Sequence, residues 1–573
     1  MQQIILAQHG ILPGEDITLP LRELFLRYPA DTEFIFEAGD YYFCPHEEMR
    51  VDYRISNSDE AHYRTLAIWM QGMKNCVLRG NGARLWLAGH MQVFTLDRCQ
   101  RVTVEGFTVD WEKPLVAEGR VVARGDMTLD VYVDPVLFPH RMGDACLEFD
   151  VGAGEWYPTI GYAIAFEPHG LTVRRGTADV RYINTEALGG SVYRLTLKRS
   201  SPVEVGDLLN LRHNARLHAG CFAEKCEDVT VRDVTFHSCG GLGCLAQFCH
   251  NATFERVHFM PNYAMGRKVS CGRDDGMHLT CNSGKLTVTQ CSFHALMDDP
   301  INVHGCCVTA NEVVDDCTLR CHYRHGQAKG FWYWAEPGDT VSMIARETMH
   351  SIGCATVESY TLESPDSFLL RLTEPVTDAV RQAAERELLA VDNLTHTADF
   401  VCTDNRFGSC RARGLLVSTP GKVEIKRNFF ESSGSAILLA GDSNYWFESG
   451  ECHDVTISQN VFAAACCSSV YQFCDGVISI SPVVPKPDEE LPYHKHILIT
   501  DNVFDLRDTP ALYAFSCRDL RFVGNRVYRR NATDASMPTV KLTYCRDGII
   551  DGKEVLVADH CRGLRREGSE KAR

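Results

Sequence analysis

The sequence has no long apolar run and no recognisable export signal. No stretch approaches the roughly 18 consecutive apolar residues of a membrane-spanning helix. The segment Met1 to Gly10 has no basic region, and its apolar run is only four residues long, so a signal peptide is not predicted. These absences argue against a membrane protein and predict a cytoplasmic location, or a secreted or periplasmic one if a leader has been removed.

Positive charge is also scarce. The 573 residues include 58 Lys and Arg against 75 Asp and Glu, a formal net charge of −17. An acidic surface disfavours nucleic acid and anionic membranes as partners, because their phosphates attract basic proteins. It is compatible with an uncharged ligand such as a sugar.

The 26 cysteines include no Cys-x-x-Cys pair, so the common spacing of zinc sites and thioredoxin-like motifs is missing. Without an export signal, the thiols are expected to be reduced. We interpret most of them as small buried apolar side chains.

A nine-residue pattern recurs along the chain, usually a polar residue, then Val-x-Val, four further residues and Phe. Alternation of this kind, with frequent Val, Ile, Phe and Thr, is typical of a β-strand. Three of the start-to-start spacings equal 23 residues. The repeats are 101–109, 228–236, 251–259, 285–293, 399–407, 422–430, 454–462, 496–504 and 519–527.

Short strands that return about every 23 residues predict a parallel β-helix, in which three strands make one coil and successive coils stack. We therefore expect an all-β protein built on a right-handed parallel β-helix. A solenoid also accommodates a chain of this length without an oversized core, since each coil contacts only its neighbours.

Two ladders of equivalent residues support the stacking. The seventh position of the last five repeats is always Asn, and stacked Asn side chains can hydrogen-bond along the axis of a β-helix. A Cys lies two residues before five of the repeats, as expected for stacked core thiols. The residues are Asn405, Asn428, Asn460, Asn502 and Asn525, and Cys99, Cys226, Cys249, Cys452 and Cys517.

Two stretches interrupt the repeat, and we interpret them as two small inserted antiparallel β-barrels. Both contain alternating apolar residues, and both carry a Glu-x-Gly-Asp turn, at 204–207 and 336–339. The predicted organisation is an N-terminal cap with one amphipathic helix and the first coils (1–110), the first barrel (111–215), coils with an aspartate cluster (216–314), the second barrel (315–398), the C-terminal coils (399–555) and a charged tail (556–573).

Two Asp-Asp pairs in the segment 271–305 mark the candidate site. The pairs, at 274–275 and 298–299, lie 24 residues apart, which is about one coil. His278 and His304 each follow a pair within a few residues. Stacked coils are ~4.8 Å apart, so we expect the two pairs to be neighbours.

The repeats give the same alignment. Asp275 lies 10 residues before the repeat at 285–293, and Asp299 lies 10 residues before a weaker repeat at 309–317. Carboxylates at this spacing repel, so at least one should hold its proton more tightly than a free Asp.

One protonated and one ionised carboxyl group can hydrolyse a glycosidic bond, because the acid protonates the leaving oxygen while the base activates a water. Two other interpretations stay open. Asp-Asp-Gly and Asp-Asp-Pro are common turn sequences, and clustered acidic oxygens can bind calcium.

The segment 271–305, with Asp-Asp-Gly-x-His, Cys-x-Phe and Asp-Asp-Pro-Ile-Asn-Val-His-Gly in order, resembles glycoside hydrolase family 110. That family comprises exo-acting α-1,3-galactosidases of gut and marine bacteria. The resemblance extends to 34–43, to 441–450 and to the interruptions of the solenoid. It implies a right-handed parallel β-helix with two small barrels, and inverting hydrolysis without metal or organic cofactor. The implied substrate is a glycan with terminal α-1,3-linked galactose, including the blood group B determinant.

The resemblance also implies roles for the aspartates. Asp298 matches the proposed general acid, while Asp275 and Asp299 match the pair that holds the attacking water. Asp274 is left over, and we expect it to be structural, bonded to the backbone or to Arg273.

A sugar site also needs hydrogen-bonding groups and an aromatic platform. Trp446 lies between Asp442 and Glu448, a cluster that favours stacking against a sugar with carboxylates on its hydroxyls. The histidines are as suited to orienting the aspartates as to touching the sugar. The remaining candidates for substrate binding are Asn302, His278, His304 and Arg413, with Arg411 beside them.

Alternatives stay open on function and assembly. A polygalacturonase-like β-helix hydrolase also uses an Asp and an Asp-Asp pair, but of its usual signatures only the fragment 425–427, Ile-Lys-Arg, is found. A non-catalytic carbohydrate-binding β-helix is the other alternative. The barrels offer surface for a homodimer, and the choice between branched and linear α-1,3-galactosides stays open.

Overall fold

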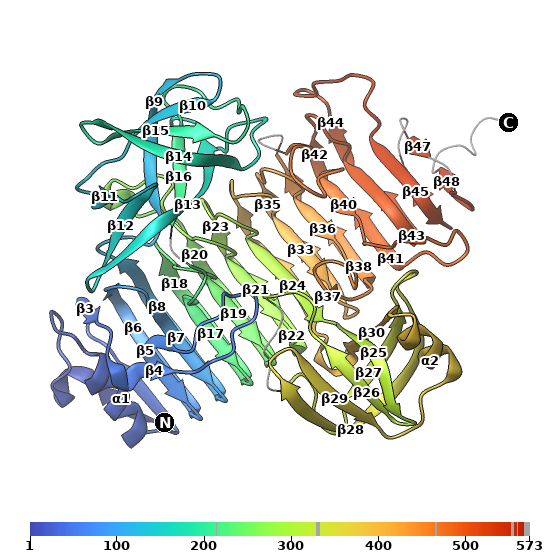
Figure 1. Cartoon of the computed structure of the whole chain (residues 1–573), viewed down its shortest axis with the longest axis horizontal. Helices are drawn as coiled ribbons and strands as arrows, with labels where there is room; N and C mark the ends of the chain where they lie inside the picture. Colours follow the sequence, from blue (N-terminus) through green and yellow to red (C-terminus); the bar gives the residue numbers. More distant parts are fainter. Residues whose placement is uncertain (214, 328–332, 464–466, 552–554, 558–559, 567–573) are drawn as a thin grey trace.

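The computed structural model describes residues 1–213, 215–327, 333–463, 467–551, 555–557 and 560–566. Its main body is a β-helix in which strands of successive coils pair in parallel, and two barrels project from it (Figure 1). The predicted fold class, an all-β parallel β-helix with two inserted antiparallel barrels, is confirmed. Within the described residues, no helix is long and apolar enough to cross a membrane.

The coils contribute strands to three parallel sheets, here called the first, second and third faces. On the first face, β17 (Cys221–Glu224), β19 (Cys244–Gln247), β21 (Met277–Thr280), β24 (Ile301–Cys306), β33 (Leu415–Ser418) and β36 (Ile437–Leu439) pair in that order. On the second, β20 (His250–Phe259), β22 (Ser283–Thr289), β31 (Asp399–Thr403) and β34 (Val423–Lys426) pair in order. On the third, the end of β20 is followed by β23 (Ser292–Phe293), β32 (Arg406–Phe407) and β35 (Phe429–Phe430).

The core lies inside these three faces, and ladders of identical side chains line it. The Phe residues that end the repeats stack with ring centroids 4.4 to 5.7 Å apart, from Phe236 to Phe504. Such pairs contribute about 0.5 to 1.5 kcal/mol each beyond their burial. The strand pattern of the repeats therefore follows from their burial in a stacked core.

The Asn and Cys ladders confirm the predicted stacking. The side-chain oxygens of the last four Asn residues accept hydrogen bonds from the backbone and side-chain N–H groups of the preceding Asn, at 2.9 to 3.0 Å. The side-chain oxygen of Asn405, the first of the ladder, accepts from the backbone N–H of Cys291. The five cysteines that precede repeats are all buried and reduced.

The first barrel is inserted between β8 (Gln100–Trp111) and β17. Six of its strands pair around a closed ring: β9 (Ala117–Arg124), β10 (Thr128–Tyr132), β15 (Val192–Leu197), β14 (Val180–Gly189), β13 (Glu155–Phe166) and β16 (Leu208–His213). β11 (His140–Met142) and β12 (Leu147–Gly152) extend the sheet beyond β13. This barrel lies at the upper left of Figure 1.

The second barrel is inserted between β24 and β31, and lies at the lower right of Figure 1. Its strands are β25 (Val308–Asp315), β26 (Thr318–His322), β29 (Ser367–Leu372), β28 (His350–Ser364), β27 (Thr340–Ala345) and β30 (Leu389–Asn393), with helix α2 (Asp378–Glu385) beside them. The weaker repeat at 309–317 is therefore a wrong prediction. These residues form β25, which pairs antiparallel with β26 and β30, since alternation indicates a strand but not its partner.

An N-terminal cap and a strap complete the β-helix. Helix α1 (Thr18–Arg27) buries Leu21, Leu24 and Phe25 at the end of the solenoid, as the predicted cap requires. Residues 52–63 then run across the outside of the first face, where Tyr53 packs with Phe222 of β17. This strap reaches the candidate site.

Candidate active site

The two Asp-Asp pairs lie in equivalent turns before adjacent strands of the first face. β21 and β24 pair with His278 opposite Asn302, which places Asp275 and Asp299 at the same register two residues before their strands. The predicted stacking of the pairs is confirmed, although the repeat at 309–317 that suggested it is not part of the β-helix. The 24-residue offset is set by the strand pairing itself.

A cavity of about 320 Å³ opens at these turns. Its walls come from turns of four coils, from the strap and from the loop at 440–448. Every predicted site residue except His304 and Arg411 lines it. The lining includes Asp275, His278, Asp298, Asp299, Asn302, Arg413, Asp442, Trp446 and Glu448, joined by Asn57, Asp59, Arg212, Arg216, Arg273, Asp274, Gln327, Leu416, Leu438 and Phe473.

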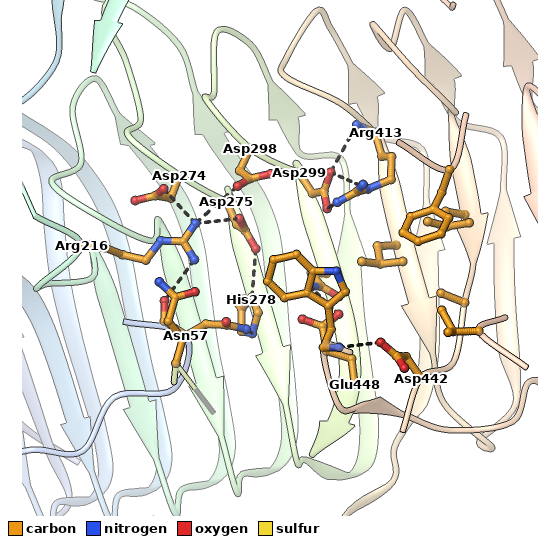
Figure 2. A pocket seen from close by; sticks show the side chains of 18 of the residues that line it. Asn57, Arg216, Asp274, Asp275, His278, Asp298, Asp299, Arg413, Asp442 and Glu448 are labelled. Atoms are coloured by element: carbon orange, nitrogen blue, oxygen red, sulfur yellow. Dashed lines mark hydrogen bonds and ion pairs between the residues drawn. The ribbon is translucent and has the colours of Figure 1, made fainter. Parts of the chain in front are cut away.

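Arg216 lies between three carboxylates, as Figure 2 shows. Its Nη2 atom is 2.8 Å from Asp274, 3.4 Å from Asp298 and 3.8 Å from Asp275. Arg273 also donates to Asp274 at 2.6 Å, as predicted for a structural residue. Burial alone would raise the pKa of Asp274, but the surrounding guanidinium groups hold it well below its usual range. Asp274 is thus an ionised anchor for Arg216.

Asp298 and Asp299 contact different arginines. The Arg411 Nη1 atom donates to Asp298 at 2.9 Å. Burial opposes ionisation of Asp298, but Arg411 and Arg216 outweigh it and lower the pKa. The Arg413 guanidinium donates three hydrogen bonds to Asp299, at 2.8 to 3.1 Å. For Asp299, burial prevails over Arg413 and raises the pKa to about 6.

Asp275 is the carboxyl group most prone to hold a proton. Burial, followed by repulsion from Asp298, raises its pKa to about 8. His278 Nδ1 lies 2.9 Å from Asp275, and burial lowers the pKa of this imidazole well below its usual value. The buried His278 therefore orients Asp275 in its neutral form.

His304 lies behind the cavity wall. Its Nε2 atom is 2.9 Å from His278 and 3.7 Å from Glu448. Glu448 also accepts a hydrogen bond from Asn302 at 3.4 Å. His304 therefore connects the Asp275–His278 pair to Glu448 from behind, while Glu448 and Asn302 face the cavity.

The loop at 440–448 presents Trp446 to the cavity. Backbone N–H groups of Asn444, Tyr445 and Trp446 donate to Asp442, so this carboxylate shapes the loop. Asp442 lines the cavity, but its oxygen atoms are largely occupied by these bonds. Trp446 is 37% exposed, and its indole ring contacts His325 at a centroid distance of 4.7 Å.

Several lining residues were not predicted. Leu416 and Leu438 could have been found, since they hold the same strand position as Asn302 on the next two coils. Arg216 and Asn57 gave no signal, because one follows the first barrel and the other belongs to the strap. Asn57 contacts His278 at 2.7 Å and accepts from Arg216 through its backbone carbonyl.

Guanidinium groups supply the positive charge between the clustered carboxylates. Across the part of the chain that the structure describes, no group of three or more His, Cys, Asp or Glu side chains is arranged to hold a metal ion. The arrangement is instead suited to holding and transferring protons.

Comparisons with known proteins add relatives of this chain. Residues 318–383, within the second barrel, match the family model GLAA-B beta-barrel domain II. The chain is 37% identical, over 88% of its length and 81% of the relative, to alpha-1,3-galactosidase B of Bacteroides thetaiotaomicron. It is 33% identical, over 85% of its length and 61% of the relative, to alpha-1,3-galactosidase B of Akkermansia muciniphila.

A solved structure with similar architecture is the A-module of a mannuronan C-5 epimerase from Azotobacter vinelandii. It is 10% identical to this chain with a TM-score of 0.40, over 98% of this chain and 96% of that one. A likeness this low has no bearing on the chemistry of the site.

Proposed function

This chain belongs to the α-1,3-galactosidase family, glycoside hydrolase family 110, and on that premise we propose that it releases terminal α-1,3-linked galactose from glycans. The substrates we propose are blood group B type and linear α-1,3-galactosyl structures. The reaction we propose proceeds with inversion at the anomeric carbon.

One observation carries the proposal: Asp275, Asp298 and Asp299 converge from two adjacent coils on a single cavity. A volume of about 320 Å³ lies at the small end of the range for ligand cavities. This size favours one terminal sugar over a polymer threaded through a long cleft. The three carboxyl groups are the chemistry that glycoside hydrolysis needs.

We assign the proton donor and the base by the family pattern. Asp298 protonates the glycosidic oxygen, while Asp275 and Asp299 hold the water that attacks the anomeric carbon from the opposite face. Water attack without a covalent intermediate inverts the anomeric configuration. The equivalent register of Asp275 and Asp299 on adjacent coils supports their acting on one water.

The charged groups around the carboxylates give the protons a different order of preference. Guanidinium groups lower the pKa of Asp298, while burial raises that of Asp275 to about 8. The two groups are linked because each carboxylate repels the other, so they titrate as a pair. A sugar that excludes water and weakens the Arg411 contact favours the proton on Asp298. Once Asp298 is neutral, its repulsion of Asp275 is lost, and Asp275 ionises more readily.

The rest of the cavity provides contacts for a sugar. Leu416 and Leu438 are neighbours on adjacent strands and, with Trp446, give the cavity apolar lining suited to the apolar face of a galactose ring. Glu448 and Asn302 present an acceptor and a donor for hydroxyl groups. A glycan is therefore the ligand class we propose for this cavity.

A substrate panel tests the function. Wild type should release galactose from branched and linear α-1,3-galactosides, but not from α-1,4- or α-1,6-galactosides or galacturonan. The Asp275→Asn variant, purified in the same way, controls for contaminating galactosidase and should be inactive. Cleavage of galacturonan alone would favour the polygalacturonase-like alternative. Binding of α-galactosides without any release would favour a carbohydrate-binding protein.

A further inference from the structure

The first barrel reaches into the candidate active site through one carboxylate. Asp179, directly before β14, accepts two hydrogen bonds from Arg411, from Nε at 2.7 Å and from Nη2 at 3.2 Å. The third nitrogen of the same guanidinium, Nη1, donates to Asp298 at 2.9 Å. One cation is thus held between a barrel carboxylate and the proposed proton donor.

The hydrogen bonds of the Arg411 guanidinium are shared unequally between Asp179 and Asp298. Two nitrogens bind Asp179 in a fork, which fixes the plane of Arg411, and a single N–H remains for Asp298. The Asp179 side chain is only 11% exposed, so this pair is shielded from solvent. Asp179 therefore both orients Arg411 and neutralises much of its charge.

Other charged groups surround the three residues. Arg216 lies 3.4 Å from the other carboxylate oxygen of Asp298, and Arg181 lies 3.7 Å from Asp179. The further titratable or charged groups that act on this cluster are Arg212, Arg413, Asp275, Asp299 and Tyr471. Asp179 is the only carboxylate of the described residues within 4 Å of Arg411 apart from Asp298.

We propose that Asp179 is a positioning residue for hydrolysis, whose negative charge offsets Arg411 so that Asp298 can carry the proton it donates. This inference rests on the proposed role of Asp298 as general acid. It also gives the first barrel a part in the reaction, since that barrel supplies the offsetting charge.

The direction of the effect follows from charge. Without Asp179, the full charge of Arg411 would act on Asp298 and stabilise its carboxylate, so the pKa of Asp298 would fall. A general acid works only while protonated, so its pKa sets the alkaline limb of the pH profile. Loss of the Asp179 charge should therefore move the alkaline limb to lower pH.

The test compares Asp179→Asn with wild type over a range of pH on an α-1,3-galactosyl disaccharide. The alkaline limb of kcat/KM should move down by about one pH unit. At pH values above the limb, kcat/KM should therefore be roughly tenfold lower than that of wild type. Asp179→Glu, which keeps the charge, should restore most of the wild-type profile. An activated aryl α-galactoside should lose much less activity, because its leaving group needs little protonation.

A matched control lies in the same barrel. Asp130 accepts two hydrogen bonds from Arg194, at 2.8 and 2.9 Å, in the same forked geometry but away from the cavity. Asp130→Asn should leave the pH profile unchanged. An Asp179→Asn profile identical to that of Asp130→Asn would overturn the proposal, and so would an equal loss on both substrates at every pH.

A second pair of variants covers the case in which Asp179→Asn does not fold, as judged by thermal melting. Arg411→Gln should raise the alkaline limb, and Asp179→Asn combined with Arg411→Gln should lower it again. If the alkaline limb lies at the same pH in these two variants, the proposal is wrong. Absence of wild-type activity on every α-galactoside would instead remove the proposed function, which keeps the two failures distinct.

Discussion

Replacing Asp298 with Asn removes the proposed proton donor while keeping the size of the side chain. Both guanidinium groups that contact it retain another carboxylate, since Arg411 keeps Asp179 at 2.7 Å and Arg216 keeps Asp274 at 2.8 Å. No buried cation is left unpaired, so the free energy of unfolding should change by no more than about 1 kcal/mol. General-acid assistance contributes about 10²- to 10⁴-fold, and hydrolysis of a disaccharide should slow by that factor.

The assay measures kcat of wild type and Asp298→Asn on an α-1,3-galactosyl disaccharide and on an activated aryl α-galactoside, with thermal melting as the check on folding. The aryl substrate should keep much of its rate, because a phenolate departs without full protonation. A disaccharide rate within about threefold of wild type would refute the acid role. Equal losses on both substrates would instead place Asp298 with the base.

Two further substitutions probe the surroundings of the reaction. Asp299→Asn should lower the free energy of unfolding by about 3 to 5 kcal/mol, because Arg413 donates three side-chain hydrogen bonds to Asp299; a melting temperature equal to that of Asp298→Asn would contradict this. Trp446→Ala should raise KM about tenfold, the loss of about 1.4 kcal/mol of ring stacking. Its melting temperature should hardly change because Trp446 is 37% exposed, and an unchanged KM would exclude stacking on the sugar.

The repeats predicted the β-helix because their physical cause is local and periodic. Phe293 and Phe407 stack at 5.2 Å, and Asn405 bonds to Asn428, because each coil presents the same side chain at the same place. The same periodicity aligned the aspartate pairs. Residues at equivalent positions of successive repeats are therefore neighbours in the structure.

The prediction at 309–317 failed for a related reason. Its alternation is that of a strand, but β25 finds its partners in the second barrel. Alternation reports which side chains face a core and not which core they face. A strand of the β-helix and a strand of an inserted barrel differ only in the lengths of the loops around them, and local propensity does not fix those lengths.

The arginines and Asp179 define the limit of sequence reasoning at the site. Arg216 follows the first barrel and Asp179 lies inside it. They are 82 and 119 residues before Asp298, and neither belongs to a repeat or motif of the sequence. Arg216 contacts Asp298, and Asp179 contacts the Arg411 that binds Asp298, only because the first barrel folds back onto the β-helix. Asp442 is the opposite case, a residue whose sequence position did give a signal. Its place near Trp446 suggested sugar binding, while in the structure its carboxylate accepts hydrogen bonds that hold the loop.

The most direct measurement is a proton NMR time course of galactose release from an α-1,3-galactosyl disaccharide by wild type. An inverting α-1,3-galactosidase should first produce β-galactose, followed by slow mutarotation to the equilibrium mixture. Initial appearance of α-galactose would show retention and contradict the mechanism. No galactose from this or any α-galactoside would contradict the function itself.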